Sequence, residues 1–165
     1  MDTADYWIQH LKLDPHPEGG FFREIYRSLI EADHKDLPKG YQGKRRFSTS
    51  IYYLLRSGDI SRFHRLKSDE LWYYHFGSPV KIILIDQEGH KSSKLLGSRP
   101  DRAEKPQVII PAGTIFGAEI TESNSFGLYG CMVTPGFEYD DFEIFSKEDL
   151  VQAYPKHADI IEKFG

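Results

Sequence analysis

Cysteine is nearly absent from this sequence, because its 165 residues include only Cys131. An intrachain disulfide is therefore excluded, and this favours a reducing compartment. Cys131 itself lies in an apolar segment with no adjacent base. We interpret it as a small buried hydrophobe rather than a nucleophile.

Long apolar runs are absent as well. The longest aliphatic run is IILI at residues 82–85, which is far too short to span a bilayer. The N-terminal segment carries acidic residues early and has no apolar region of the signal-peptide kind. We therefore expect a cytoplasmic protein with no membrane partner.

An excess of positive charge is also missing. The formal net charge is −4, and the basic residues are scattered apart from Lys44, Arg45 and Arg46. A general nucleic-acid binder needs a concentrated basic face. The composition therefore predicts no nucleic-acid partner, and we assign the three-residue cluster to a solvent-exposed strand edge.

Aromatic residues, by contrast, make up 14 % of the chain. From residue 45 to residue 133, short segments rich in β-branched and aromatic residues alternate with turn signals. About eight strands at this spacing must close or pair in order to hide their edges, so they predict an all-β barrel or sandwich.

Helical patterns occur only near the two ends. Residues 3–13 suit a short helix, and Ser146 followed by Asp149 resembles a capping box that opens a second one. We expect a single domain over residues 1–165, with a barrel core at about 20–145 and a helical C-terminal tail at 146–165.

One central segment carries a recognisable motif. The segment is GDISRFHRLKSDELWYYHFG, and it contains Gly58, His64, Glu70 and Gly77. Their spacing resembles the first motif of the cupins, G-x₅-H-x-H-x₃-E-x₆-G. The mismatch is Leu66, which stands where the motif has its second histidine.

A second segment, PAGTIF, resembles the second cupin motif through Pro111 and Gly113, with Phe116 in place of its histidine. Three further segments also look like a cupin family of unassigned function, so that five segments in order cover nearly the whole chain: LDPHPEGGFFREIYRS, RRFSTSIYYLL and TPGFEYDDFEI. The resemblance implies a double-stranded β-helix (a jelly-roll barrel), usually homodimeric, with a ligand pocket inside. Among characterised proteins, it points to the dTDP-4-dehydrorhamnose 3,5-epimerases and the seed-storage globulins.

The resemblance also bears on metal binding. In metal-binding cupins, three histidines and one glutamate bind a single ion. Of these four ligands, only His64 and Glu70 remain here. Catalytic metal sites need about three protein ligands. We therefore predict no metal and no other cofactor, and an incomplete metal site is the weakest of three hypotheses.

The remaining pair favours proton chemistry. A carboxylate beside a histidine in an apolar pocket places a base near neutral pH. The metal-independent epimerases of this fold use a histidine base oriented by a carboxylate, with a tyrosine acid. By resemblance, His64 is the candidate base, Glu70 its orienting partner and Tyr74 the candidate acid, because Tyr74 shares a strand face with Glu70.

The two-residue alternation of side chains along a strand also indicates candidate ligand-binding residues. Arg62 shares a face with His64 and would bind the diphosphate of a nucleotide sugar. Trp72 and Phe116 would form a stacking wall for a sugar or a base. Ser50 and Tyr53 lie on opposite faces of one strand, and both stay candidates because the sequence does not say which face looks inward.

The leading hypothesis is a small-molecule-binding cupin that acts as a metal-independent epimerase or isomerase on a nucleotide sugar or a similar polar ligand. The alternative is a non-catalytic ligand-binding or storage-like cupin. In that case the buried histidine–glutamate pair is a vestigial contact that holds two strands in register. Glu18 lies in a polar, glycine-rich segment, where we expect a loop over the barrel mouth or at a dimer contact rather than core.

Overall fold

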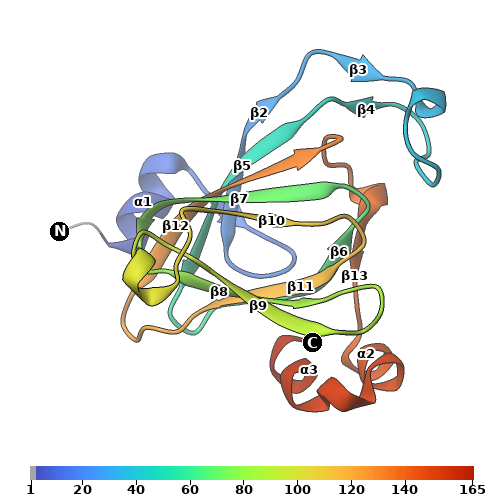
Figure 1. Cartoon of the computed structure of the whole chain (residues 1–165). Helices are drawn as coiled ribbons and strands as arrows, with labels where there is room; N and C mark the ends of the chain where they lie inside the picture. The colour runs from blue at the N-terminus through green and yellow to red at the C-terminus, as the bar shows by residue number, and fades with distance from the viewer. Residues whose placement is uncertain (1–2) are drawn as a thin grey trace.

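Two β-sheets face each other in the computed structural model, which describes residues 3–165 (Figure 1). The six-stranded sheet has the order β1 (Asp14–Pro15), β2 (Phe21–Arg27), β5 (Thr49–Arg56), β12 (Phe126–Thr134), β7 (Asp69–Gly77) and β10 (Gln107–Ile110). The five-stranded sheet has the order β13 (Phe142–Ile144), β6 (Ile60–Leu66), β11 (Ile115–Ile120), β8 (Val80–Ile85) and β9 (Lys91–Leu96).

The chain passes back and forth between the sheets. Strands β5, β7, β10 and β12 lie in the larger sheet, and β6, β8, β11 and β13 in the smaller one. Neighbouring strands within both sheets pair antiparallel. This winding places the inward side chains of both sheets against one another, and a mostly β architecture with short terminal helices is confirmed.

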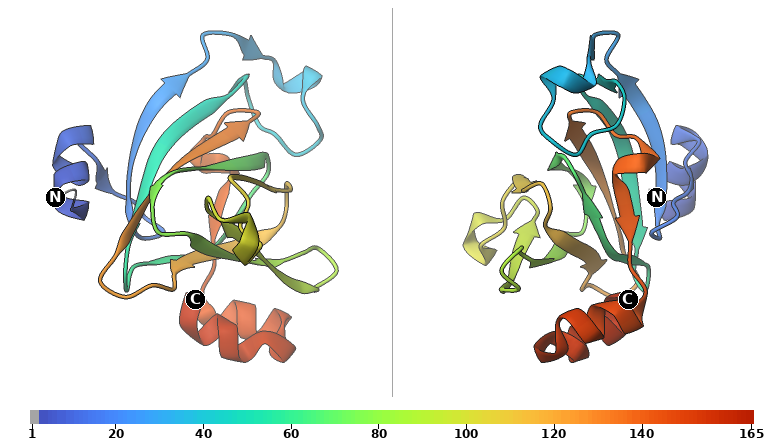
Figure 2. Two further views of the ribbon diagram at one scale, coloured as in Figure 1. Left: turned by 60° about the vertical axis from the view of Figure 1, so that its left-hand side comes forward. Right: turned by 90° about the vertical axis from the view of Figure 1, so that its right-hand side faces the viewer.

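The helices cover outer faces of the sheets. Helix α1 (Ala4–Leu11) packs on the larger sheet, while α2 (Lys147–Ala153) and α3 (Ala158–Phe164) pack below the smaller one (Figure 2). The expected cap is confirmed, since Ser146 Oγ accepts a hydrogen bond from the backbone N–H of Asp149 at 3.1 Å. Four 3₁₀ turns complete the helical segments: His34–Asp36, Pro100–Arg102, Tyr139–Asp141 and Pro155–His157.

The main core fills one end of the space between the sheets. Trp72, Phe116 and Tyr129 are at most 1 % exposed and belong to one apolar cluster. Because side chains fill this end of the barrel, a cavity between the sheets is expected toward the opposite end.

A two-stranded arm projects from that opposite end. It consists of β3 (Glu31–Ala32) and β4 (Arg45–Arg46), and all three ribbon views show it standing away from the barrel (Figures 1 and 2). Arg45, which we expected at a solvent-exposed edge, is instead 3 % exposed. It donates through Nε to Asp141 Oδ2 at 2.5 Å. This buried ion pair joins the base of the arm to the barrel.

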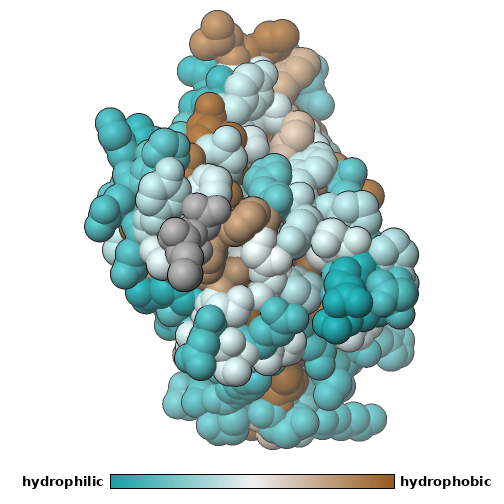
Figure 3. Space-filling model, turned by 90° about the vertical axis from the view of Figure 1, so that its left-hand side faces the viewer, coloured by the Kyte–Doolittle hydropathy of each residue, from teal (hydrophilic) through white to brown (hydrophobic). Residues whose placement is uncertain are grey.

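Apolar side chains are also exposed in the segment that links β2 to β3 and leads into the arm. Leu29 is 92 % exposed and Ile30 is 61 % exposed. Figure 3 shows brown, apolar surface at the end of the molecule where the arm projects. Within residues 3–165, no helix is long and apolar enough to cross a membrane.

Candidate functional site

A cavity of about 330 Å³ opens between the two sheets at the arm end of the barrel. Strands from both sheets and the loop before β2 contribute to it. Its lining residues are His16, Glu18, Phe22, Glu24, Arg27, Thr49, Ile51, Tyr53, His64, Leu66, Glu70, Trp72, Cys131, Val133, Phe137, Glu138, Tyr139 and Phe142. Cavities that hold small organic ligands have about 300–1,000 Å³ and mix apolar walls with a few polar groups, as this one does.

A buried ion pair lies inside the cavity. His64 Nε2 is 3.0 Å from Glu18 Oε2, and the other carboxylate oxygen of Glu18 accepts a hydrogen bond from Ser61 Oγ at 2.9 Å. The three residues are between 0 % and 6 % exposed. Burial opposes the charge on Glu18, but the adjacent imidazolium and these hydrogen bonds outweigh it and lower the pKa of Glu18 to about 2.

Both ring nitrogens of His64 face acceptors, so the doubly protonated imidazolium is the form that suits this arrangement. Its Nδ1 lies 2.7 Å from the carbonyl oxygen of Arg62, and a carbonyl only accepts. Its Nε2 faces the ionised carboxylate of Glu18, which also only accepts. Burial by itself would lower the pKa of His64, but the charge and hydrogen bond of Glu18 raise it above its ordinary value.

A tight loop delivers Glu18 to this position. The backbone N–H of Arg62 donates to the carbonyl oxygen of Glu18 at 2.8 Å, which ties the loop to β6. Gly19 follows with φ of +117°, and a Cβ there would overlap the carbonyl oxygen of Ile60. Only glycine allows this approach, so the loop can press a carboxylate into the barrel instead of lying over its mouth.

Two polar atoms at the cavity wall make no well-aligned hydrogen bond among residues 3–165, although the Trp72 indole and the Cys131 thiol lie close enough to Glu70 to lower its pKa. The two atoms are Glu70 Oε2 and Trp72 Nε1, from residues two apart on β7 that both line the cavity. Burial raises the pKa of Glu70 to about 7, although the nearby charge of His64 opposes the shift. Buried polar atoms are rarely left unpaired, so these two indicate where a ligand would bind.

The pairing we expected from the sequence therefore differs from the one observed. Glu18, rather than Glu70, is hydrogen-bonded to His64, and Glu70 keeps a free oxygen instead. The sequence placed Glu18 in a surface loop because polar and glycine-rich segments are usually solvated. Its one signal was the adjacent pair of glycines, which permits the unusually close approach to β6.

A β-bulge explains why Arg62 does not face the cavity. Phe116 pairs with His64 and Ala118 pairs with Ser61, so β6 contains one extra residue at this point. The extra residue breaks the two-residue alternation, and Ser61 and His64 both reach Glu18. Arg62 is exposed, and its Nη2 donates to the carbonyl oxygen of Pro17 at 2.9 Å.

The face of β5 that looks inward is now defined. Tyr53 and Thr49 line the cavity, whereas Ser50 lies on the opposite face in a groove beside α1. Ser50 therefore cannot contact a ligand in the barrel. The hydroxyl of Tyr53 donates to the carbonyl oxygen of Gly19 at 2.7 Å and supports the loop that carries Glu18.

Two further candidates lie beside the cavity but do not line it. Tyr74 packs against the core cluster, and its hydroxyl donates to the carbonyl oxygen of Gly77 at 2.6 Å. It is therefore not placed to protonate a ligand at Glu70. Phe116 packs its ring against His64 with 4.1 Å between centroids, so it fills space behind the imidazole. Trp72, in contrast, does line the cavity.

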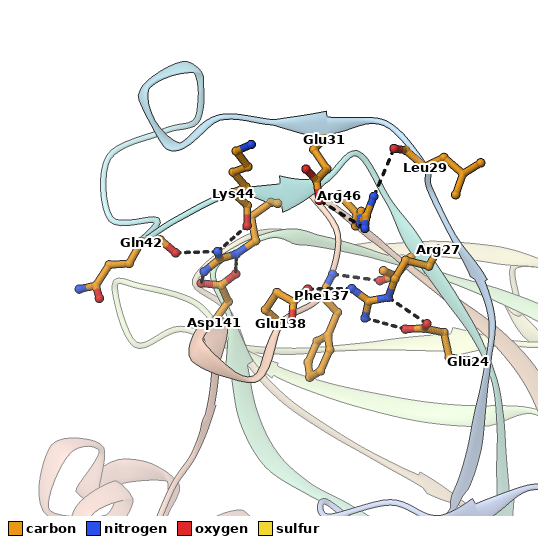
Figure 4. Close-up of polar contacts among 12 residues, drawn as sticks. Glu24, Arg27, Leu29, Glu31, Gln42, Lys44, Arg46, Phe137, Glu138 and Asp141 are labelled. Atoms are coloured by element: carbon orange, nitrogen blue, oxygen red, sulfur yellow. Dashed lines mark hydrogen bonds and ion pairs between the residues drawn. The ribbon is translucent and has the colours of Figure 1, made fainter.

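Charged side chains surround the mouth of the cavity. Arg27 Nη1 donates to Glu138 Oε1 at 2.7 Å, and its Nε and Nη2 donate to the two oxygens of Glu24. Figure 4 shows the guanidinium between the two carboxylates, with the Phe137 ring pointing away from the arm. The one arginine at the mouth is thus fully engaged by two carboxylates.

The donor set does not fit the metal site of a cupin. Leu66 lines the cavity where a ligand histidine would be, and Phe116 covers one face of His64. Both nitrogens of His64 are already hydrogen-bonded. Within residues 3–165, the only group of three ligand atoms close enough to share an ion is an exposed one on the β8–β9 hairpin: Asp86, Glu88 and His90.

Comparison with known proteins gives close relatives without a stated activity. The sequence matches the family model described as Cupin superfamily (DUF985) over residues 5–145. A Shewanella oneidensis protein of known crystal structure is 43 % identical, with a TM-score of 0.90 and coverage of 100 % of this chain and 98 % of that chain. A hypothetical protein from Leishmania major is 35 % identical, with a TM-score of 0.92 and 99 % coverage of both chains.

A more distant likeness concerns the fold alone. Oxalate decarboxylase from Bacillus subtilis is 16 % identical, with a TM-score of 0.55, and the match covers 92 % of this chain and 36 % of that chain. The double-stranded β-helix expected from the sequence is confirmed by this likeness together with the family match. No curated protein matches the sequence.

Proposed function

The chain belongs to the cupin superfamily, in the family DUF985, and on that premise we propose that its cavity binds a small polar molecule and moves a proton on it. The observation that carries the proposal is the pair of unpartnered polar atoms, Glu70 Oε2 and Trp72 Nε1, side by side on β7. One can accept a proton and the other can only donate a hydrogen bond. Proton abstraction next to a carbonyl group needs one group of each kind.

The reaction uses Glu70 as the base. Its carboxylate removes the proton from the carbon beside the carbonyl, and the electron pair of the broken C–H bond moves into a new carbon–carbon double bond. The carbonyl oxygen takes the negative charge and accepts a hydrogen bond from Trp72 Nε1. Protonated Glu70 then delivers the proton to the former carbonyl carbon on the same face, while the hydroxyl proton of the carbon that lost its hydrogen moves to the oxyanion, and the product is the isomeric carbonyl compound. A pKa of about 7 suits both halves of this cycle.

His64 has a different role in this scheme from the one its motif implies. Both of its nitrogens already donate, so it has no lone pair with which to take a proton from a ligand. Its fixed positive charge favours the ionised form of Glu70. We therefore assign His64 and Glu18 to positioning and electrostatics, and proton transfer to Glu70.

The ligand we propose is the size of a monosaccharide rather than a whole nucleotide sugar. The cavity volume of about 330 Å³ lies near the lower limit for ligand sites. A diphosphate would need a free cationic group at the mouth, and Arg27 there is already shared by Glu24 and Glu138. Both points support a compact molecule that carries a carbonyl and hydroxyl groups.

Deuterium labelling tests the reaction even while the substrate is unidentified. A small-molecule extract is incubated in heavy water with the protein, and carbonyl compounds that gain one mass unit are found by mass spectrometry. Labelling should occur with the wild type and with Glu143→Gln, whose carboxylate pairs with Arg65 outside the cavity. It should be absent with Glu70→Gln. Equal labelling by Glu70→Gln would show that Glu70 is not the base.

The non-catalytic alternative also has an observation in its favour. The ion pair of His64 and Glu18 fastens the N-terminal loop to β6, and this is a sufficient structural reason for both residues. A pure binding protein would retain a metabolite in the cavity while labelling none. Absence of label with the wild type, combined with a retained compound, would therefore replace the enzyme proposal with this one.

A homodimer is part of the proposal as well. It is supported by the exposed apolar side chains of the segment that leads into the arm, among them Leu29 and Ile30, which a second copy would cover. Sedimentation should show a dimer for the wild type and a monomer for Leu29→Ser/Ile30→Ser. We also propose a cytoplasmic location, which the buried free thiol of Cys131 supports.

A further inference from the structure

Three aromatic rings meet at the cavity mouth in different planes. Phe137 and Tyr139 lie 5.1 Å apart between centroids at 79°, and Tyr139 and Phe142 lie 6.2 Å apart at 89°. All three line the cavity, and Tyr139 is 58 % exposed. These rings pack edge to face, and a ring face that remains open toward the cavity can attract an organic cation.

The charges at the cavity mouth also favour a cationic ligand. The carboxylates of Glu24 and Glu138 share the single guanidinium of Arg27, so this group of three carries one negative charge in excess. Deeper in the cavity, Glu18 is balanced by His64, and Glu70 adds a further acid. His16 also lines the cavity, with Nδ1 3.6 Å from Glu18 Oε2, so each basic side chain of the described lining lies beside a carboxylate and the acidic residues are in excess.

The inner end of the cavity favours a ligand that carries an oxygen atom. Trp72 Nε1 is a buried donor that needs an acceptor, and Glu70 Oε2 is a buried oxygen that needs a partner. A simple ammonium ion offers no acceptor to the indole N–H. A molecule with a carbonyl or hydroxyl oxygen at one end and a positive charge at the other would satisfy both ends.

We infer that the ligand is a small amino compound, whose protonated or methylated amine lies among Phe137, Tyr139 and Phe142 while its oxygen lies at Trp72. The inference rests on the proposed function only for the reacting end, because the mouth would select an amine whether or not a proton is moved. Amino sugars and amino ketones belong to this class. Phosphorylated and carboxylated sugars are excluded by the same charges.

Isothermal titration calorimetry with matched probes tests the inference. Glucosamine is compared with glucose and with glucose phosphate, and choline with its uncharged carbon isostere dimethylbutanol. The two cations should bind at millimolar concentration, and each should bind about three- to thirtyfold more tightly than its neutral counterpart. Glucose phosphate should bind more weakly than glucose.

Variants at the mouth identify the groups responsible. Tyr139→Ala removes an exposed ring, and Glu138→Gln removes the excess charge while leaving Arg27 paired with Glu24. Each should reduce cation binding about three- to thirtyfold and leave glucose binding unchanged. Glu143→Gln, outside the cavity, is the matched control and should change neither.

Each contrary result has a distinct meaning. If neither cation binds, or if the neutral or phosphorylated probe binds as tightly, the inference is wrong. If the wild type labels only uncharged carbonyl compounds with deuterium, the proposed reaction is supported and the inference that the ligand carries an amine is wrong. If cations bind selectively but no compound is labelled, the amine-binding site is supported and the proposed reaction is wrong.

Discussion

His64 and Glu18 form a buried ion pair, with 3.0 Å between Nε2 and Oε2, and each is held by a further hydrogen bond to β6. The pair joins the loop that precedes β2 to the smaller sheet. It also fixes the charge of the imidazole that faces the cavity. The stability of the loop and the electrostatics of the site therefore depend on the same contact.

Glu18→Gln should strongly destabilise the protein. The substitution keeps the shape of the side chain but leaves the buried imidazolium without its counter-ion, which costs about 3–5 kcal/mol. Urea unfolding at neutral pH measures the effect. The control is Glu143→Gln, which breaks the surface pair with Arg65 and should cost about 0.2–1 kcal/mol. Equal costs for the two variants would mean that the buried pair contributes no more than a surface one.

The cost of Glu18→Gln should also depend on pH. The pKa of Glu18 is lowered from 4.5 to about 2, so its carboxylate stabilises the folded state above pH 4.5 and loses this effect as the pH falls toward 2. The difference in unfolding free energy between wild type and variant should shrink over that range. A difference that stays constant down to pH 2 would contradict the assignment.

Glu70→Gln should stabilise the protein at neutral and alkaline pH. The pKa of Glu70 is raised from 4.5 to about 7, so between these values the unfolded chain releases a proton that the folded chain retains, and the wild type loses stability as the pH rises. Glutamine removes this penalty, which is on the order of 3 kcal/mol above pH 7. Thermal unfolding of both proteins from pH 4 to pH 8 should show the gap widening in favour of the variant. A parallel pair of curves would mean that Glu70 titrates normally.

Gly19→Ala should be far more harmful than Gly40→Ala. Both glycines have positive φ, at +117° and +109°, so alanine at either site costs about 1–3 kcal/mol in backbone strain. At Gly40 a Cβ meets nothing within 4 Å, but at Gly19 it overlaps the carbonyl oxygen of Ile60. This overlap should add about 1–3 kcal/mol and displace the loop that carries Glu18. Denaturant unfolding of the two variants compares them, and similar midpoints would contradict the close approach.

Leu66→His/Phe116→His should create a metal site. Both positions adjoin His64, because Phe116 pairs with it across β6 and β11 and Leu66 lines the same cavity. Together with Glu70, the new imidazoles supply the three or more ligands that zinc or manganese requires. The measurement is stoichiometric metal content, made in a His90→Ala background so that the exposed group of Asp86, Glu88 and His90 does not contribute. Binding by the parent His90→Ala protein at the same stoichiometry would mean that the cavity already holds the ion.

The sequence predicted the fold well because the signals for it are local. β-Branched and aromatic residues define the strands, the motif spacing around His64 and Glu70 indicates the barrel, and the pair of Ser146 and Asp149 caps a helix as expected. Each of these patterns depends on neighbours a few residues away. None of them depends on which distant segments meet.

The site was harder to predict because its central contact joins distant segments. Glu18 comes from a loop whose composition predicts solvent exposure, and only the three-dimensional approach to Ile60 shows that it is buried. Arg62 and Ser50 were assigned by regular alternation, which cannot reveal a bulge or say which face of a strand looks inward. Trp72 and Tyr53 do line the cavity, because β7 and β5 keep their alternation there.

The extra residue in β6 has an evolutionary consequence. Deleting a single codon between Ser61 and His64 would restore the regular alternation, with both of these residues on the inward face and one outward residue between them. The length of β6 at this point therefore decides which of its side chains face the barrel. Alignments of this family should therefore be inspected for length changes at this point before substrate preference is transferred from one member to another.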